Sequence, residues 1–222
     1  MASTPLDLQL LNALAALFLL LAFAMLSQRR VVTLVDLLAA QGALLCGATL
    51  LLAWRTGQNH LYVSALLTLV LKVAFLPWLL HRLIRRLGVY WDSEPLINIS
   101  GTMLLGLLVV IFSFGLAQPI AALASTATRN AIGIAVAVVL LSFLTMITRR
   151  KAMSQVVGFL GMENGLFFGA MSATYGMPMV VELGVALDVL VAMLVLGVFF
   201  FQIREQFDSL DLHHLESLKE DK

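Results

Sequence analysis

Three charged residues lie near the middle of long apolar stretches, where a charge is rare. They are Glu163, Asp188 and Lys72, and Gln41 occupies a matching depth in another apolar stretch. A charge at the centre of a membrane helix costs about 2.5 to 3.5 kcal/mol on insertion scales, so these groups should face protein, a partner subunit or water. Burial disfavours the charged form of such a group, and a neighbouring opposite charge favours it. Carboxylates and one amine at this depth are therefore suited to proton transfer.

Other roles for these residues stay open. A static ion pair between Lys72 and Asp188 would hold two parts of the chain together without moving a proton, and substrate binding is the remaining alternative. Asp36 and Glu182 lie nearer to the ends of their apolar stretches. Asp36 would either pair with a nearby arginine or take part in proton uptake. Glu182 and Asp188 are six residues apart, which places them on helix faces about 120° apart, so they need not serve one site.

Glycines recur at three- and four-residue intervals around Glu163. They are Gly158, Gly161, Gly165 and Gly169. Small residues on one stripe let membrane helices approach closely. This stripe predicts a helix-packing seam with Glu163 beside it.

Signatures of soluble enzymes are missing from the sequence. It contains no phosphate-binding glycine loop followed by lysine and no nucleophile elbow. Cys46 is the single cysteine, which excludes a cysteine-ligated cluster within this chain. The histidines fall at span ends or in the carboxyl-terminal tail, at His60, His81, His213 and His214. We therefore expect a non-catalytic chain with no cofactor and no metal site. A net charge of +1 also gives no nucleic-acid surface.

The elements that must position the central charges are membrane helices. Hydrophobic residues make up 61% of the chain and charged residues 12%, with a mean hydropathy of +0.98. A soluble domain carries roughly half apolar and a quarter charged residues. Stretches long enough to cross a bilayer predict an all-α bundle of about seven transmembrane helices. They run from Leu8 to Leu26, Val31 to Ala53, Leu61 to Leu80, Ile97 to Leu116, Ala131 to Ile147, Met153 to Tyr175 and Met179 to Phe201.

The basic residues predict the orientation of this bundle. With seven spans, one side of the membrane receives most of the lysines and arginines, and the other receives only Arg55 and Arg129. Basic residues favour the cytoplasmic side. We expect a multi-pass protein of the bacterial cytoplasmic membrane, with its amino terminus outside and its carboxyl terminus in the cytoplasm.

The layout also predicts a parallel duplication of a three-helix unit. A helix ending in a double arginine, at Arg29 and Arg30 or at Arg149 and Arg150, precedes a helix with a central polar residue. A third helix with a central charge follows in each half. The expected parts are residues 1–96, a linker helix over 97–117, residues 118–203 and an amphipathic cytoplasmic tail over 204–222.

Two segments carry a resemblance to a known family. Gly161 to Gly169 reads GMENGLFFG, and Val181 to Leu190 reads VELGVALDVL. Together they closely resemble hydrogenase-4 component E, a membrane subunit of energy-converting hydrogenase and formate hydrogenlyase complexes. The last three helices are similar to the three-helix subunit K of respiratory complex I and to the C subunit of multisubunit sodium/proton antiporters.

The resemblance implies a role in proton translocation within a larger complex. It places Glu163 at the first carboxylate of a buried hydrophilic axis, while Asp188 and Glu182 compete for the second. Gln41 and Lys72 take those places in the first unit. The implied partners are antiporter-like and other membrane subunits, a cytoplasmic hydrogenase arm and the lipid bilayer. A subunit of a cation/proton antiporter and a small independent transporter remain the alternatives.

Overall fold

The structure is a computed structural model that describes residues 6–88, 90, 98–121, 126–174 and 197. The chain divides into two compact units, Met1–Val185 and Ala186–Lys222. Every helix described below belongs to the first unit. The expected seventh span, from Met179 to Phe201, and the amphipathic tail lie outside the described residues, so both stay predictions.

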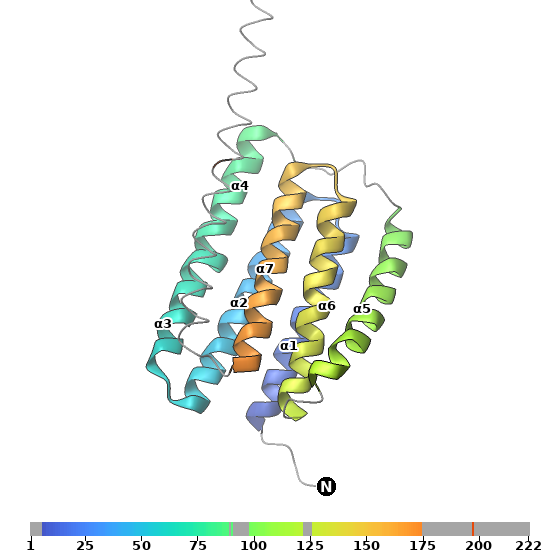
Figure 1. The fold of residues 1–222 in the computed structure, drawn as a ribbon. Helices are drawn as coiled ribbons and strands as arrows, with labels where there is room; N and C mark the ends of the chain where they lie inside the picture. The colour runs from blue at the N-terminus through green and yellow to red at the C-terminus, as the bar shows by residue number, and fades with distance from the viewer. Residues whose placement is uncertain (1–5, 89, 91–97, 122–125, 175–196, 198–222) are drawn as a thin grey trace, which may run out of the picture. The chain divides into compact units, whose positions relative to one another are not determined.

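The described part of the first unit is helical throughout (Figure 1). Six helical stretches are long and apolar enough to cross a membrane, and they correspond to the first six predicted spans. The largest difference is at the end of the third span, predicted at Leu80 and observed at Leu87. The elements are α1 (Leu6–Ser27), α2 (Val31–Thr56), α3 (Asn59–Thr68), η1 (Leu69–Phe75), α4 (Leu76–Leu87), α5 (Ile99–Ala121), α6 (Thr126–Thr148) and α7 (Ala152–Thr174).

The third span consists of three consecutive elements. The π-helix η1 joins α3 to α4, and the N–H of Leu76 donates to the carbonyl of Leu71, five residues earlier. Pro77 follows in the first turn of α4, where it has no N–H to donate to the preceding turn. Gly57 and Gly88, both with positive φ, end α2 and α4. Glycine adopts this left-handed conformation without a steric penalty, so it ends helices well.

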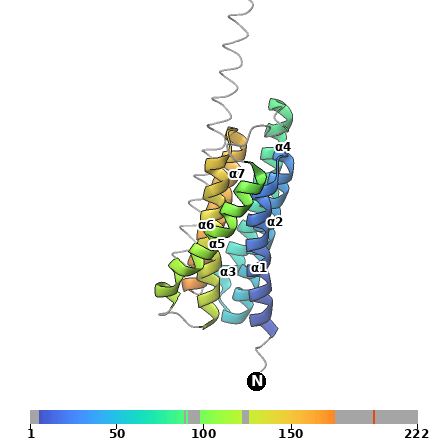
Figure 2. The same cartoon turned by 90° about the vertical axis from the view of Figure 1, so that its right-hand side faces the viewer.

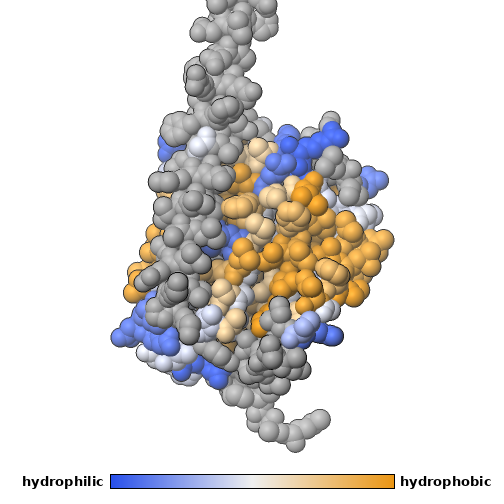
Figure 3. All heavy atoms as spheres, in the orientation of Figure 1, coloured by the Kyte–Doolittle hydropathy of each residue, from blue (hydrophilic) through white to orange (hydrophobic). Residues whose placement is uncertain are grey.

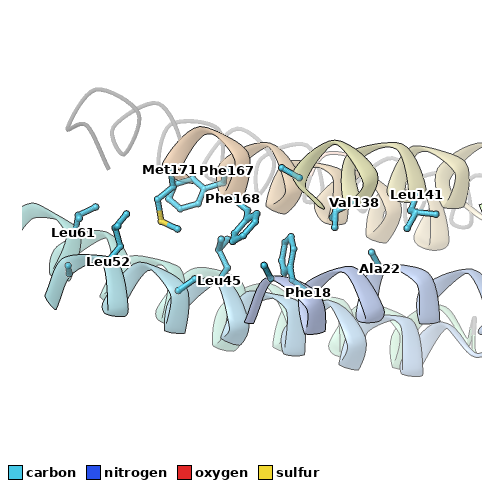
Figure 4. Close-up of a cluster of buried hydrophobic side chains, with 14 of the residues drawn as sticks. Phe18, Ala22, Leu45, Leu52, Leu61, Val138, Leu141, Phe167, Phe168 and Met171 are labelled. Carbon is cyan, nitrogen blue, oxygen red and sulfur yellow. The ribbon is translucent and has the colours of Figure 1, made fainter. Parts of the chain in front are cut away.

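The helices pack along their lengths around a common apolar core (Figures 1 and 2). Within this unit α1 contacts α2, α5 and α6, while α7 lies between α6 and α2. Phe18 of α1 and Phe168 of α7 meet at the centre of the core, with ring centroids 5.2 Å apart (Figure 4). Apolar side chains from α2, α3 and α6 complete the cluster, among them Leu45, Leu61 and Val138.

The predicted glycine seam is confirmed, and its partner is α6. A Cβ atom added at Gly158 would lie 2.9 Å from the backbone nitrogen of Met146, and one added at Gly165 would lie 2.9 Å from Val139. Gly161 and Gly169 approach α6 equally closely. Glycines on α7 therefore allow the close helix approach that positions Glu163.

One end of the described helices gathers the basic loops. The N–H of Val31 donates to the carbonyl of Tyr90, which brings the start of α2 to the loop after α4. Arg149, at the end of α6, is buried and donates from Nη2 to the carbonyls of Met25 at 3.3 Å and Leu26 at 3.0 Å. Figure 3 shows apolar residues over the middle of the helices and hydrophilic residues mainly at their ends. This distribution fits a multi-pass membrane protein; its orientation and its duplication stay predictions.

Candidate functional site

The centre of the described bundle contains a buried ion pair. Lys72 of η1 and Glu163 of α7 lie with Nζ 3.0 Å from Oε1, and their side chains are only 4% and 2% exposed. The amine also lies 5.4 Å from the ring centroid of Phe167, within the range of a cation–π contact. These residues are 91 positions apart. Packing therefore brings together two charges that the sequence placed at matching depth.

The close approach of α2 to η1 helps to position the lysine. A Cβ atom added at Gly42 would lie 3.2 Å from the Cβ of Lys72 and 3.3 Å from its carbonyl oxygen. Glycine at this position lets the two backbones come together without displacing Lys72. The π-helical turn lies at the same place, and such turns are frequent at functional sites.

Gln41 lies close to this pair on α2 and is fully buried. Neither its Oε1 nor its Nε2 has a hydrogen-bond partner within the described chain, and the same holds for the hydroxyl of Ser142 on α6. Both side chains flank Gly161: a Cβ atom added there would lie 2.9 Å from Ser142 Oγ and 3.6 Å from Gln41 Oε1. The buried polar region thus extends from α2 to α6, and sequence analysis missed Ser142.

Asp36 occupies a different environment from the central residues. Its Oδ1 lies 3.2 Å from Nε2 of His81 on α4, and the two side chains are 62% and 31% exposed. The predicted alternatives were an arginine partner and proton uptake. Within the described residues, the ion-pair partner of Asp36 is His81. The other ring nitrogen of His81, Nδ1, lies 2.8 Å from the carbonyl oxygen of Pro77.

The remaining predicted carboxylates, Glu182 and Asp188, lie outside the described residues. The proposed pairing of Lys72 with Asp188 therefore stays untested, while the pairing with Glu163 was not predicted. Within the described ranges no group of three histidine, cysteine or acidic side chains could hold a metal ion. The chemistry that the described site offers is protonation and hydrogen bonding.

Comparison with known proteins gives relatives along most of the sequence. The chain is 37% identical over 188 residues to a Mycobacterium tuberculosis protein described as uncharacterized protein Rv0085, covering 84% of this chain and 86% of that protein. It is 23% identical over 210 residues to hydrogenase-4 component E of Escherichia coli and of Shigella flexneri, covering 95% of this chain and 97% of each relative. No family model matches the sequence. No solved structure matches it either.

Proposed function

Because this chain belongs to the family of the mycobacterial protein Rv0085 and is distantly similar over its full length to hydrogenase-4 component E, we propose that it is a non-catalytic membrane subunit of an energy-converting hydrogenase complex. In this proposal Lys72 and Glu163 contribute to a proton-translocation path. The partners are other membrane subunits, including antiporter-like ones, and a cytoplasmic hydrogenase arm. The chain lies in the bacterial cytoplasmic membrane with its carboxyl terminus in the cytoplasm.

The observation that carries the proposal is the buried contact between Lys72 and Glu163. At 3.0 Å, each charge stabilises the charged form of the other against the cost of burial. A proton that binds Glu163 neutralises the carboxylate and removes its attraction for Lys72, so the charge state of one side chain depends on that of the other. Coupled charges buried at this depth suit a proton-transfer site.

The surroundings of the pair support the same role. Gln41 cannot titrate near neutral pH, but its amide can both donate and accept hydrogen bonds. Its amide atoms and the Ser142 hydroxyl have no partner within the described residues, and buried polar groups of this kind are usually satisfied by water or by protein. Buried polar side chains that can donate and accept hydrogen bonds beside an ion pair suit proton transfer.

The test is proton pumping by the complex that contains this chain, reconstituted in vesicles. Glu163→Gln keeps the size and hydrogen-bonding capacity of the side chain but removes its titration, so proton pumping per assembled complex should fall. The Asp188→Asn variant should behave likewise. Ser154→Ala removes another buried polar group of α7 and serves as the control with normal pumping.

Normal pumping at normal abundance in both carboxylate variants would reject the relay. A gene neighbourhood without hydrogenase large- and small-subunit genes would instead favour a cation/proton antiporter assembly. The redox partner is therefore tested separately from the proton path.

A further inference from the structure

We propose that Gln41 of α2 and Ser142 of α6 bind an internal water molecule beside Gly161 of α7. Gln41 and Ser142 are only 0% and 2% exposed. Neither amide atom of Gln41 and not the hydroxyl oxygen of Ser142 has a hydrogen-bond partner among the described residues. Buried polar groups are nearly always hydrogen-bonded, and internal water molecules satisfy those that no protein group reaches.

The place of Gly161 brings the two side chains to one point. A Cβ atom added at Gly161 would lie 2.9 Å from Oγ of Ser142 and 3.6 Å from Oε1 of Gln41. Both oxygens are therefore within 3.6 Å of the same point, yet they form no hydrogen bond with each other. Polar groups that lie close but beyond direct contact are typical of a water bridge. Because glycine carries no side chain into this space, a small molecule can lie between the two oxygens.

The hydroxyl of Ser142 is turned away from its own helix. On α6 the hydroxyl of Thr145 donates to the carbonyl of Leu141 at 2.9 Å, and that of Thr148 donates to the carbonyl four residues before it at 2.7 Å. Serine and threonine commonly make this bond inside membrane helices. Ser142 does not make it, and its Oγ lies against Gly161 instead. Its orientation therefore points to a ligand between the helices.

The hydrogen-bonding groups of the site match a neutral ligand. Oε1 of Gln41 accepts, Nε2 donates, and the hydroxyl of Ser142 can do either. A water molecule can donate to Oε1 and at the same time donate to the hydroxyl or accept from it. A metal ion is a poorer match, because both side chains are neutral and bring two side-chain oxygens, whereas Ca²⁺ takes about six to eight.

The first experiment detects the water by NMR spectroscopy of the full-length chain in lipid nanodiscs. With ¹⁵N-labelled glutamine, the side-chain amide signals of Gln41 are assigned by their loss in Gln41→Met. We expect magnetisation to pass directly from water to this amide in the wild type, although the residue is fully buried. No transfer to the assigned amide would overturn the proposal.

Displacement of the water tests its position. In the double variant Gly161→Ala with Ser142→Ala, the new methyl group fills the space, and the second substitution removes the oxygen that this group would meet at 2.9 Å. The transfer should be lost. Gly169→Ala is the matched control, because its methyl group would lie 2.9 Å from the Cβ of Ala135 on the same seam and should leave the transfer intact. Transfer that persists in the double variant, or that is lost equally in the control, would overturn the assignment.

The second experiment measures the equilibrium constant of unfolding in mixed micelles, and its direction separates a hydrated site from a dry one. Ser142→Ala should raise this constant by roughly 2- to 10-fold, because the water loses a partner. Thr145→Val, whose hydroxyl is bonded within its own helix, is the reference for the loss of one satisfied hydrogen bond. In a dry site, removal of an unsatisfied hydroxyl would leave the constant unchanged or lower it. A Ser142→Ala chain at least as stable as the wild type would therefore overturn the proposal.

Discussion

Replacing the partners of the buried ion pair one at a time and then together is the sharpest test of the central site. The variants are Glu163→Gln, Lys72→Met and the double variant. The pair lies 3.0 Å apart, and two unit charges at this distance attract by about 5 kcal/mol at an effective dielectric constant of about 20. That attraction offsets part of the cost of burying the two charges.

The expected pattern is a strong coupling between the two substitutions. Each single variant should lower the free energy of unfolding by about 3 to 5 kcal/mol, because it removes one member of a buried ion pair and leaves the other charge in place. The double variant should lie within about 1 kcal/mol of the wild type, since both burial costs vanish with the attraction. Coupling of this kind is measured by a double-mutant cycle.

Unfolding of the purified chain in mixed micelles by added denaturing detergent gives these free energies, with Ser154→Ala as the control for a buried polar substitution on α7. Losses that simply add in the double variant would refute the reasoning, because they would mean that the two charges are stabilised independently. The same variants also bear on function. A double variant that folds but does not pump would separate the stabilising role of the pair from its role in proton transfer.

Three further predictions concern the frame around the site. Arg149→Ala should lower the free energy of unfolding by about 2 to 3 kcal/mol through lost charged hydrogen bonds, while the exposed Arg150→Ala should cost less than about 1 kcal/mol. Gly158→Ala should cost about 1 to 3 kcal/mol, because its new methyl group meets the backbone of α6. The Gly115→Ala control meets nothing within 4 Å and should be neutral or stabilising in the same assay. A cytoplasmic reporter should be active when fused after Lys222 and inactive when fused at Met1, and equal activity at both ends would contradict the seven-span topology.

The sequence alone predicted most of the described fold. Long apolar stretches must satisfy their backbone hydrogen bonds within the lipid, and helices do so segment by segment. The first six spans follow from this rule, with errors confined to their ends. The π-helical turn at Lys72 could not be predicted from the sequence. A change of one residue in hydrogen-bond spacing produces no recognisable change in the pattern of hydrophobic residues. Pro77, shortly after it, was the available signal for an irregular turn.

The candidate site was predictable in depth but not in pairing. The burial of Lys72, Glu163 and Gln41 follows from the cost of exposing polar groups to lipid, and all three are buried. Which carboxylate meets Lys72 depends on how α7 packs against α2, and that contact joins distant parts of the sequence. The histidine partner of Asp36 depends in the same way on the contact between α2 and α4.

The clamp from Arg149 to the end of α1 has a consequence for biogenesis. The last carbonyls of α1 belong to a helix made at the start of synthesis, yet the guanidinium that binds them arrives 123 residues after Leu26. Until α6 and the residue after it have been made, those carbonyls must be hydrogen-bonded by water or by another group, as the last carbonyls of any helix are. The hydrogen bonds that join the end of the first helix to the bundle therefore form only after the fifth membrane crossing has been made.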